Sequence, residues 1–311
     1  MLKNQFSIGI LGQNPDSIAP QLAMWGNMKL WNVMWKKISG WWEEQDLLKR
    51  QIETETLVLK NSKSPDELRV TMLVELAEHL EVPLPQSMTA GDFDDLGKNI
   101  VAKAIVTLRK TDKEFNGTSA NEMASHVLKK LFDDLQNRFE EQDRESQEKI
   151  VEAIRKGIGE LPEDQKKRLQ DELNVDGLTN EAVRKAIVTG SLGAAFAVVV
   201  EVAGFSAYMV AMQVLATVTG LIGITLPFAA YTTLTSMMAF LANPLIIGPA
   251  FLVFGYWLTS RGNRKIRDGL TPVLVTQALA NSAMGERNDE QVRDFLLVYN
   301  RSRLSASAGN S

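Results

Sequence analysis

Residues 186–260 read AIVTGSLGAAFAVVVEVAGFSAYMVAMQVLATVTGLIGITLPFAAYTTLTSMMAFLANPLIIGPAFLVFGYWLTS, and Glu201 is the only charged side chain among them. Basic residues stand at both borders of this hydrophobic block: Arg184 and Lys185 before it, and Arg261, Arg264, Lys265 and Arg267 after it. No other part of the chain shows this segregation of charge. The pattern predicts a membrane-inserting or membrane-competent helical hairpin, with the rest of the chain as a charged helical head that serves it.

Two stretches of the hydrophobic block, residues 202–226 and 228–258, are long enough to cross a hydrocarbon core of about 30 Å. Pro227 separates them and predicts a turn, whereas residues 186–200 span only about 22 Å as a helix and are too short. Since basic residues flank both ends, both ends are expected on the cytoplasmic side. The residues expected to insert are Val202, Phe205, Tyr208, Leu226, Pro227, Phe228, Tyr256 and Trp257.

The single acid of the block restricts how the helices lie. A carboxylate at the middle of a bilayer costs about 2.5 to 3.5 kcal/mol on insertion scales. We therefore expect Glu201 at the inner margin of the membrane or facing other helices, and it is the candidate acid of a pore or of a helix interface.

The composition of the block leaves three hypotheses open. Serine and threonine are frequent between residues 217 and 236, where a lipid-facing helix would use more leucine. A hydrophobic helix pair wrapped inside amphipathic helices has the same composition. The block is therefore resident in the inner (cytoplasmic) membrane with a cytosolic head, or held in a cytoplasmic protein until triggered, or a permanent core. A pore would require self-association, because two arms cannot enclose an aqueous path.

The N-terminal segment, residues 1–42, contains a second candidate for membrane contact. Met28, Trp31, Trp35 and Trp42 recur at helical spacing on one face, with lysines on the remainder. Indole rings suit the headgroup layer, and they also suit packing on the protein's own core or on a partner. Before this helix, residues 6–12 are expected to form a β-strand that runs into a glycine turn, without the second glycine and the lysine of a phosphate-binding loop.

The head, residues 43–180, is predicted to be entirely helical, so the protein is expected to be all-α. Ser64 with Glu67 predicts a capping box, and Thr179 predicts the cap of the helix that leads into the block. The hairpin segment takes in residues 181–268. Residues 269–311 are expected to form one amphipathic helix, beginning near residue 288, and a tail that is disordered from residue 301.

The residues that carry chemistry are few. The chain has no cysteine and two histidines, and each histidine follows a glutamate by four residues, as Glu75 with His79 and Glu122 with His126. The two pairs could meet as a four-ligand metal site, but the spacing is common by chance in glutamate-rich helices. We therefore expect no metal, no cofactor and no enzymatic activity. A net charge of −4 gives no support for a nucleic-acid partner, so the expected partners are membrane lipid, further copies of the chain and a protein bound by the head.

Three stretches resemble the YaaW-like family of bacterial proteins. They are the run from Thr71 to Leu80, the segment from Leu128 to Ile154, and the glycine-rich hairpin with Gly204 to Tyr208 and Gly248-Pro249. The resemblance covers roughly residues 66–282 and leaves the Trp-rich segment outside. It implies a bacterial helical protein with a hydrophobic C-terminal region, and it implies no catalytic residues.

Overall fold

A computed structural model describes residues 2–26, 53–140, 142–205, 207–211, 214, 263–282 and 289–308 of the chain. All the regular structure in these ranges is helical, so the all-α prediction is confirmed there. The chain forms two compact units. Unit 1 contains the described residues up to 113 and from 263 onward, and unit 2 contains those from 114 to 214. This grouping differs from the four segments predicted from composition, because the two ends of the chain belong to one unit.

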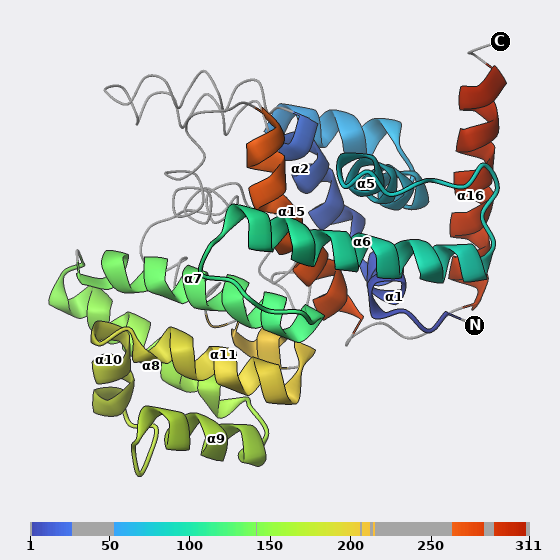
Figure 1. The fold of residues 1–311 in the computed structure, drawn as a ribbon. Helices are drawn as coiled ribbons and strands as arrows, with labels where there is room; N and C mark the ends of the chain where they lie inside the picture. Colours follow the sequence, from blue (N-terminus) through green and yellow to red (C-terminus); the bar gives the residue numbers. More distant parts are fainter. Residues whose placement is uncertain are drawn as a thin grey trace. The chain divides into compact units, whose positions relative to one another are not determined.

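Unit 1 is built around a helix from the C-terminal part of the chain. Its helices are α1 (Gln5–Gly12), α2 (Pro15–Gly26), α5 (Pro65–His79), α6 (Ala90–Thr111), α15 (Asn263–Asn281) and α16 (Asp289–Ala308), and residues 53–62 are also helical. Every residue of α15 from 269 to 281 is buried, and the helix packs against α1 and α6 (Figure 1). Gly9 of α1 allows this contact, because a Cβ there would lie 1.6 Å from the backbone oxygen of Ala278.

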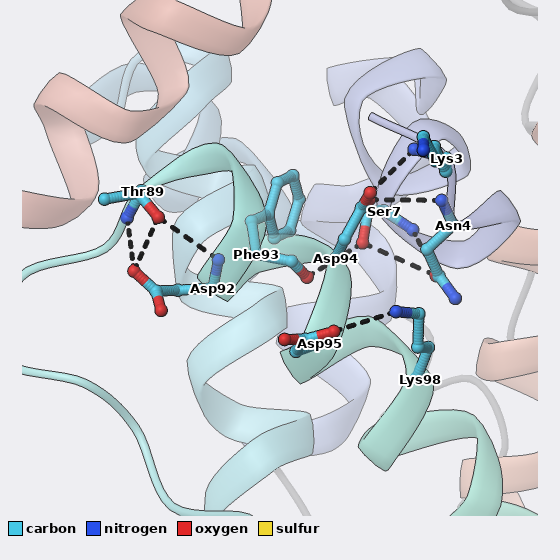
Figure 2. A network of polar contacts seen from close by, with 9 residues as sticks. All are labelled: Lys3, Asn4, Ser7, Thr89, Asp92, Phe93, Asp94, Asp95 and Lys98. Carbon is cyan, nitrogen blue, oxygen red and sulfur yellow. Dashed lines mark hydrogen bonds and ion pairs between the residues drawn. The ribbon is translucent and has the colours of Figure 1, made fainter. Parts of the chain in front are cut away.

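The prediction of a β-strand at residues 6–12 is wrong, because these residues belong to helix α1. The Asn4 side chain caps the helix by accepting a hydrogen bond from the amide of Ser7. Figure 2 shows how the start of the chain is fixed to α6: Asp94 accepts hydrogen bonds from the amides of Lys3 and Asn4, at 2.7 and 3.1 Å. The Ser7 hydroxyl donates to the carbonyl oxygen of Phe93 at 2.9 Å. Because α1 is apolar all round and buried, it lacks the polar face that would have identified a helix.

The helix starts predicted for the head are confirmed. Ser64 and Glu67 form the capping box of α5, and the Thr179 side chain accepts from the amide of Ala182. A second capping box begins α6, where Thr89 and Asp92 bond reciprocally (Figure 2). The Thr89 hydroxyl and amide donate to Asp92 and hold the pKa of that carboxyl below its ordinary value. Asp92, at the positive end of the α6 dipole, therefore also has a structural partner.

The C-terminal part of the chain contains more helix than expected. Helix α15 was not predicted, and α16 continues to Ala308, so residues 301–308 are helical where a disordered tail was expected. Phe295 of α16 stacks on Phe93 at 4.7 Å between ring centroids, and Tyr299 donates a hydrogen bond to the carbonyl oxygen of Pro85. These contacts join α16 to the start of α6 and to the loop before it.

Unit 2 encloses the beginning of the hydrophobic block. Its helices are α7 (Ala120–Glu140), α8 (Arg144–Gly159), α9 (Glu163–Leu173), α10 (Asn180–Val188) and α11 (Ser191–Ala203). Figure 1 shows α11 between α7 and α9, and it packs against both. Phe196 of α11 stacks on Phe132 of α7 at 5.0 Å, and the Ser125 hydroxyl of α7 donates to the carbonyl oxygen of Ala197.

The chain bends by 100° between α10 and α11. Gly190 lies at the bend with a φ of +70°, in the left-handed region that favours glycine. The helix capped by Thr179 therefore ends at Val188. It contains only the first three residues of the hydrophobic block, and the chain turns before the rest of the block begins.

Candidate membrane-contact site

Arg267, one of the basic residues after the hydrophobic block, belongs to a polar cluster at one end of unit 1. Arg267, in the first turns of α15, places its guanidinium over the indole of Trp25, with Cζ 5.0 Å from the ring centroid. It also donates a hydrogen bond to the carbonyl oxygen of Trp25 at 3.3 Å, and its Nη1 lies 3.8 Å from Oε2 of Glu75. The indole nitrogen of Trp25 donates to that same carboxylate at 3.0 Å. The last turn of α2 and the first turns of α15 are therefore held together through α5.

A histidine completes the cluster. His79, at the last position of α5, places Nε2 3.0 Å from Oδ1 of Asp268, and only 5% of its side chain is exposed. Its ring lies edge-on to Trp25 with centroids 5.2 Å apart. We refer to Trp25, Glu75, His79, Arg267 and Asp268 as the exit cluster, because Trp25 lies just before the Trp-rich stretch and Arg267 and Asp268 lie just after the hydrophobic block in the sequence.

An exposed ion pair extends the exit cluster. Glu81 follows the end of α5 with a φ of +55°, a left-handed conformation that costs a residue other than glycine roughly 1 kcal/mol. Arg264 donates a hydrogen bond to its carboxylate at 2.5 Å, and this bond lowers the pKa of Glu81 and raises the pKa of Arg264. Two basic residues from the border of the hydrophobic block thus have acidic partners, so their charge is partly compensated.

Unit 2 contains the predicted insertion residues that the structure describes. Phe205 and Tyr208 are buried, and their rings contact each other edge to face at 6.4 Å. Val202 is 59% exposed, and Glu201 beside it is also exposed, so Glu201 lies on the surface of unit 2. The residues at the end of α11, Glu201 and Val202, are therefore exposed, whereas Phe205 and Tyr208, which follow Gly204, are buried.

Contacts with α8 hold the chain after Gly204. A Cβ at Gly157 would lie 2.3 Å from Cγ2 of Val214, so glycine is needed at this position for Val214 to approach. The Tyr208 hydroxyl is buried without a hydrogen-bond partner in the described part of the chain. Burial of an unpaired hydroxyl costs about 1–3 kcal/mol.

The remaining predicted site residues lie outside the described ranges. These are Met28, Trp31, Trp35, Trp42, Leu226, Pro227, Phe228, Tyr256 and Trp257. Their proposed membrane contacts stay predictions.

The two Glu–His pairs are engaged separately. Glu75 and His79 belong to the exit cluster, whereas Glu122 caps α7 by accepting from the amides of Thr118 and Ser119, both at 2.7 Å. These bonds lower the pKa of Glu122 to about 2. His126 lies against the Phe115 ring at 5.1 Å. No group of three or more potential metal ligands occurs among the described residues, and the four-ligand arrangement is not formed.

Sequence reasoning identified the basic border residues but not their partners. Trp25 and Arg267 are separated by 242 positions, and no local pattern connects them. The sequence features that could have suggested this contact were a tryptophan at the end of one helix and a run of basic residues, with no acid among them, at the start of another.

Length and composition support membrane crossing only weakly within the described ranges. No single helix in these ranges is both long enough and apolar enough to cross a membrane. One bent pair, α10 with α11, has the required length and composition when the two helices are taken together. The chain matches no protein-family model, no curated protein and no solved structure.

Proposed function

We propose that the protein is a non-enzymatic, membrane-associated protein whose hydrophobic block inserts in or perturbs the bilayer, with the charged helices on the cytosolic side. The observation that carries the proposal is the run of 75 residues with Glu201 as its only charge, bordered by basic residues on both sides. A block of this length is long enough for two crossings of a hydrocarbon core.

The burial of the first part of the block favours conditional insertion. Phe205, Tyr208 and Val214 are buried in unit 2, so this part is stored against the protein's own helices. The unpaired Tyr208 hydroxyl makes the stored state less stable than a fully satisfied core would be. A bilayer surface would offer that hydroxyl water or headgroup partners. In this proposal a pore forms only after several chains associate.

A helical interaction or scaffold protein is the second candidate function. The observation that favours it is α11, which is apolar apart from Glu201, has most of its residues buried, and packs against α7 and α9. In this function the block remains a core, and the head binds a protein partner.

Fractionation of cells that express the full chain separates the two functions. The membrane pellet is washed in high salt and then in carbonate at high pH. Retention through both washes supports insertion, and recovery as a folded species in the soluble fraction overturns residence in the membrane. Release of dye from liposomes, measured against protein concentration, then tests perturbation of the bilayer.

A matched pair of double variants sharpens this test. Leu226→Asp with Phe228→Asp adds two acids at the predicted turn, and both must cross the hydrocarbon core for the hairpin to insert. Leu57→Asp with Leu304→Asp adds the same charge at exposed positions of unit 1. Only the first pair is expected to release the protein from the pellet, and equal behaviour of the two pairs contradicts insertion at the turn.

A further inference from the structure

We propose that the end of unit 1 formed by the exit cluster, together with Glu81 and Arg264, is the surface of this unit that faces the lipid bilayer. This inference rests on the proposed function and adds to it the orientation of unit 1. The occupant of the surface is lipid, and a second copy of the chain is the alternative that the experiment below distinguishes.

The first step is the direction of the helices. Along α5, Arg69 binds the carbonyl oxygen of Gln13 just before α2, and Glu75 binds the indole of Trp25 in the last turn of α2. Helices α2 and α5 therefore run in the same direction. Along α15, Arg267 contacts Trp25 and Gln277 contacts Gln21, so α15 runs in the opposite direction to α2. The ends of α2 and α5 and the start of α15 consequently meet at one end of unit 1 (Figure 1).

The second step is the length of chain between this end and the hydrophobic block. The block ends at Ser260, and α15 begins at Asn263. Three residues span at most roughly 11 Å even when fully extended. A membrane that holds the end of the block therefore lies close to Asn263, and through Arg267 it lies close to the whole exit cluster.

The third step is that a second candidate for membrane contact starts from the same place. The Trp-rich stretch begins directly after Gly26. Trp25, the residue before this glycine, is a member of the exit cluster. Both sequence segments with membrane character are thus connected to unit 1 at this one end.

The charges of the surface predict how it binds. Arg264 is paired with Glu81, Arg267 lies near Glu75, and His79 lies against Asp268, so positive charge is partly cancelled. Attraction to anionic headgroups is therefore weak, and burial of apolar chain holds unit 1 at the bilayer. Binding that resists high salt follows from this.

The orientation is measured with single fluorophores, which the absence of cysteine makes straightforward. Glu78→Cys places a label on an exposed residue at the exit-cluster end of α5, and Asn61→Cys places one on an exposed residue just before its start. The two ends of this 15-residue helix are about 22 Å apart. The full-length labelled proteins are mixed with vesicles of equal parts phosphatidylcholine and phosphatidylglycerol that carry a nitroxide on the headgroup.

The expected result is that the nitroxide quenches the label at position 78 several-fold more strongly than the label at position 61. Equal quenching, or stronger quenching at position 61, overturns the orientation while membrane binding stands. If the fluorescence of the label at position 78 changes only when the protein self-associates in the absence of lipid, the surface binds a second copy of the chain. That result also overturns the proposal. Failure of the protein to sediment with vesicles removes the proposed function itself.

A second pair of labels covers the case in which either variant fails to fold. Lys110→Cys and Gly91→Cys label exposed positions at the two ends of α6. The start of α6 lies toward the end of α15, because Ser7 of α1 binds the carbonyl oxygen of Phe93 and Gly9 of α1 packs on Ala278, so position 110 lies toward the exit cluster. Stronger quenching at position 110 is expected, and the reverse order overturns the proposal.

Discussion

Gly157 of α8 lies so close to Val214 that an added Cβ would be 2.3 Å from Cγ2 of the valine. Val214 belongs to the stored part of the hydrophobic block. Because the valine side chain is branched at Cβ and strongly prefers one χ1 rotamer in a helix, turning it away from the added Cβ costs energy. The contact thus makes the storage of this segment sensitive to a single methyl group.

We expect Gly157→Ala to loosen the segment that contains Val214. Gly159→Ala, on the same helix with nothing within 4 Å, is the control and shares the gain in helix propensity. Relative to this control, overpacking in Gly157→Ala is expected to lower the free energy of unfolding by about 1–3 kcal/mol. Faster hydrogen exchange of residues 207–211 accompanies it. Identical stability of the two variants contradicts close packing at this position.

The anchoring of the chain start by Asp94 makes a second prediction. Asp94→Asn weakens the two charge-assisted hydrogen bonds from the amides of Lys3 and Asn4, and the expected loss in urea unfolding is about 1–3 kcal/mol. Asp95→Asn, in the same turn, breaks only an exposed ion pair with Lys98, which contributes about 0–1 kcal/mol. An effect of Asp95→Asn as large as that of Asp94→Asn would argue for a general effect on the helix dipole.

The pKa of Glu122 gives a prediction for acid. Its value in the folded protein is about 2, below the ordinary value of 4.5, so the unfolded chain binds more protons between these pH values. Stability from this group is complete above about pH 4.5 and is lost as the pH falls toward 2. In the Glu122→Gln variant, the midpoint temperature of thermal unfolding is therefore expected to depend less on pH in this window. An unchanged profile would show that the capping bonds are not maintained in solution.

Graded changes at Trp25 test the exit cluster. Trp25→Phe keeps an aromatic ring beneath Arg267 and removes the hydrogen bond to Glu75, which is expected to cost about 1–2 kcal/mol. Trp25→Ala removes the ring as well, with an expected cost of about 3–5 kcal/mol. Chemical denaturation measures both. If the two variants lose the same amount, the ring contacts with His79 and Arg267 contribute nothing.

Local chemistry was sufficient to predict several elements of the fold. Ser64 with Glu67, and Thr179, satisfy amides within three residues, so their roles can be read from a short window. Helix α1 could not be read in this way, because a run of apolar residues buried on all sides has neither helical nor strand periodicity. Helix α15 was hidden for the opposite reason: Thr276, Gln277 and Asn281 are polar and yet buried. The exit cluster depends on residues that meet only in the folded chain.

The pairing of the first helices with α15 has a consequence for the order of events during synthesis. Gln21 and Gln277 form a buried hydrogen bond across 256 positions, so unit 1 is incomplete until its C-terminal helices have been translated. By then the whole hydrophobic block has been made. Domains whose contacts are local fold as the chain emerges, but this unit must wait for its last helices. The block is therefore exposed to its surroundings before unit 1 is complete, and unit 1 cannot restrain it during that interval.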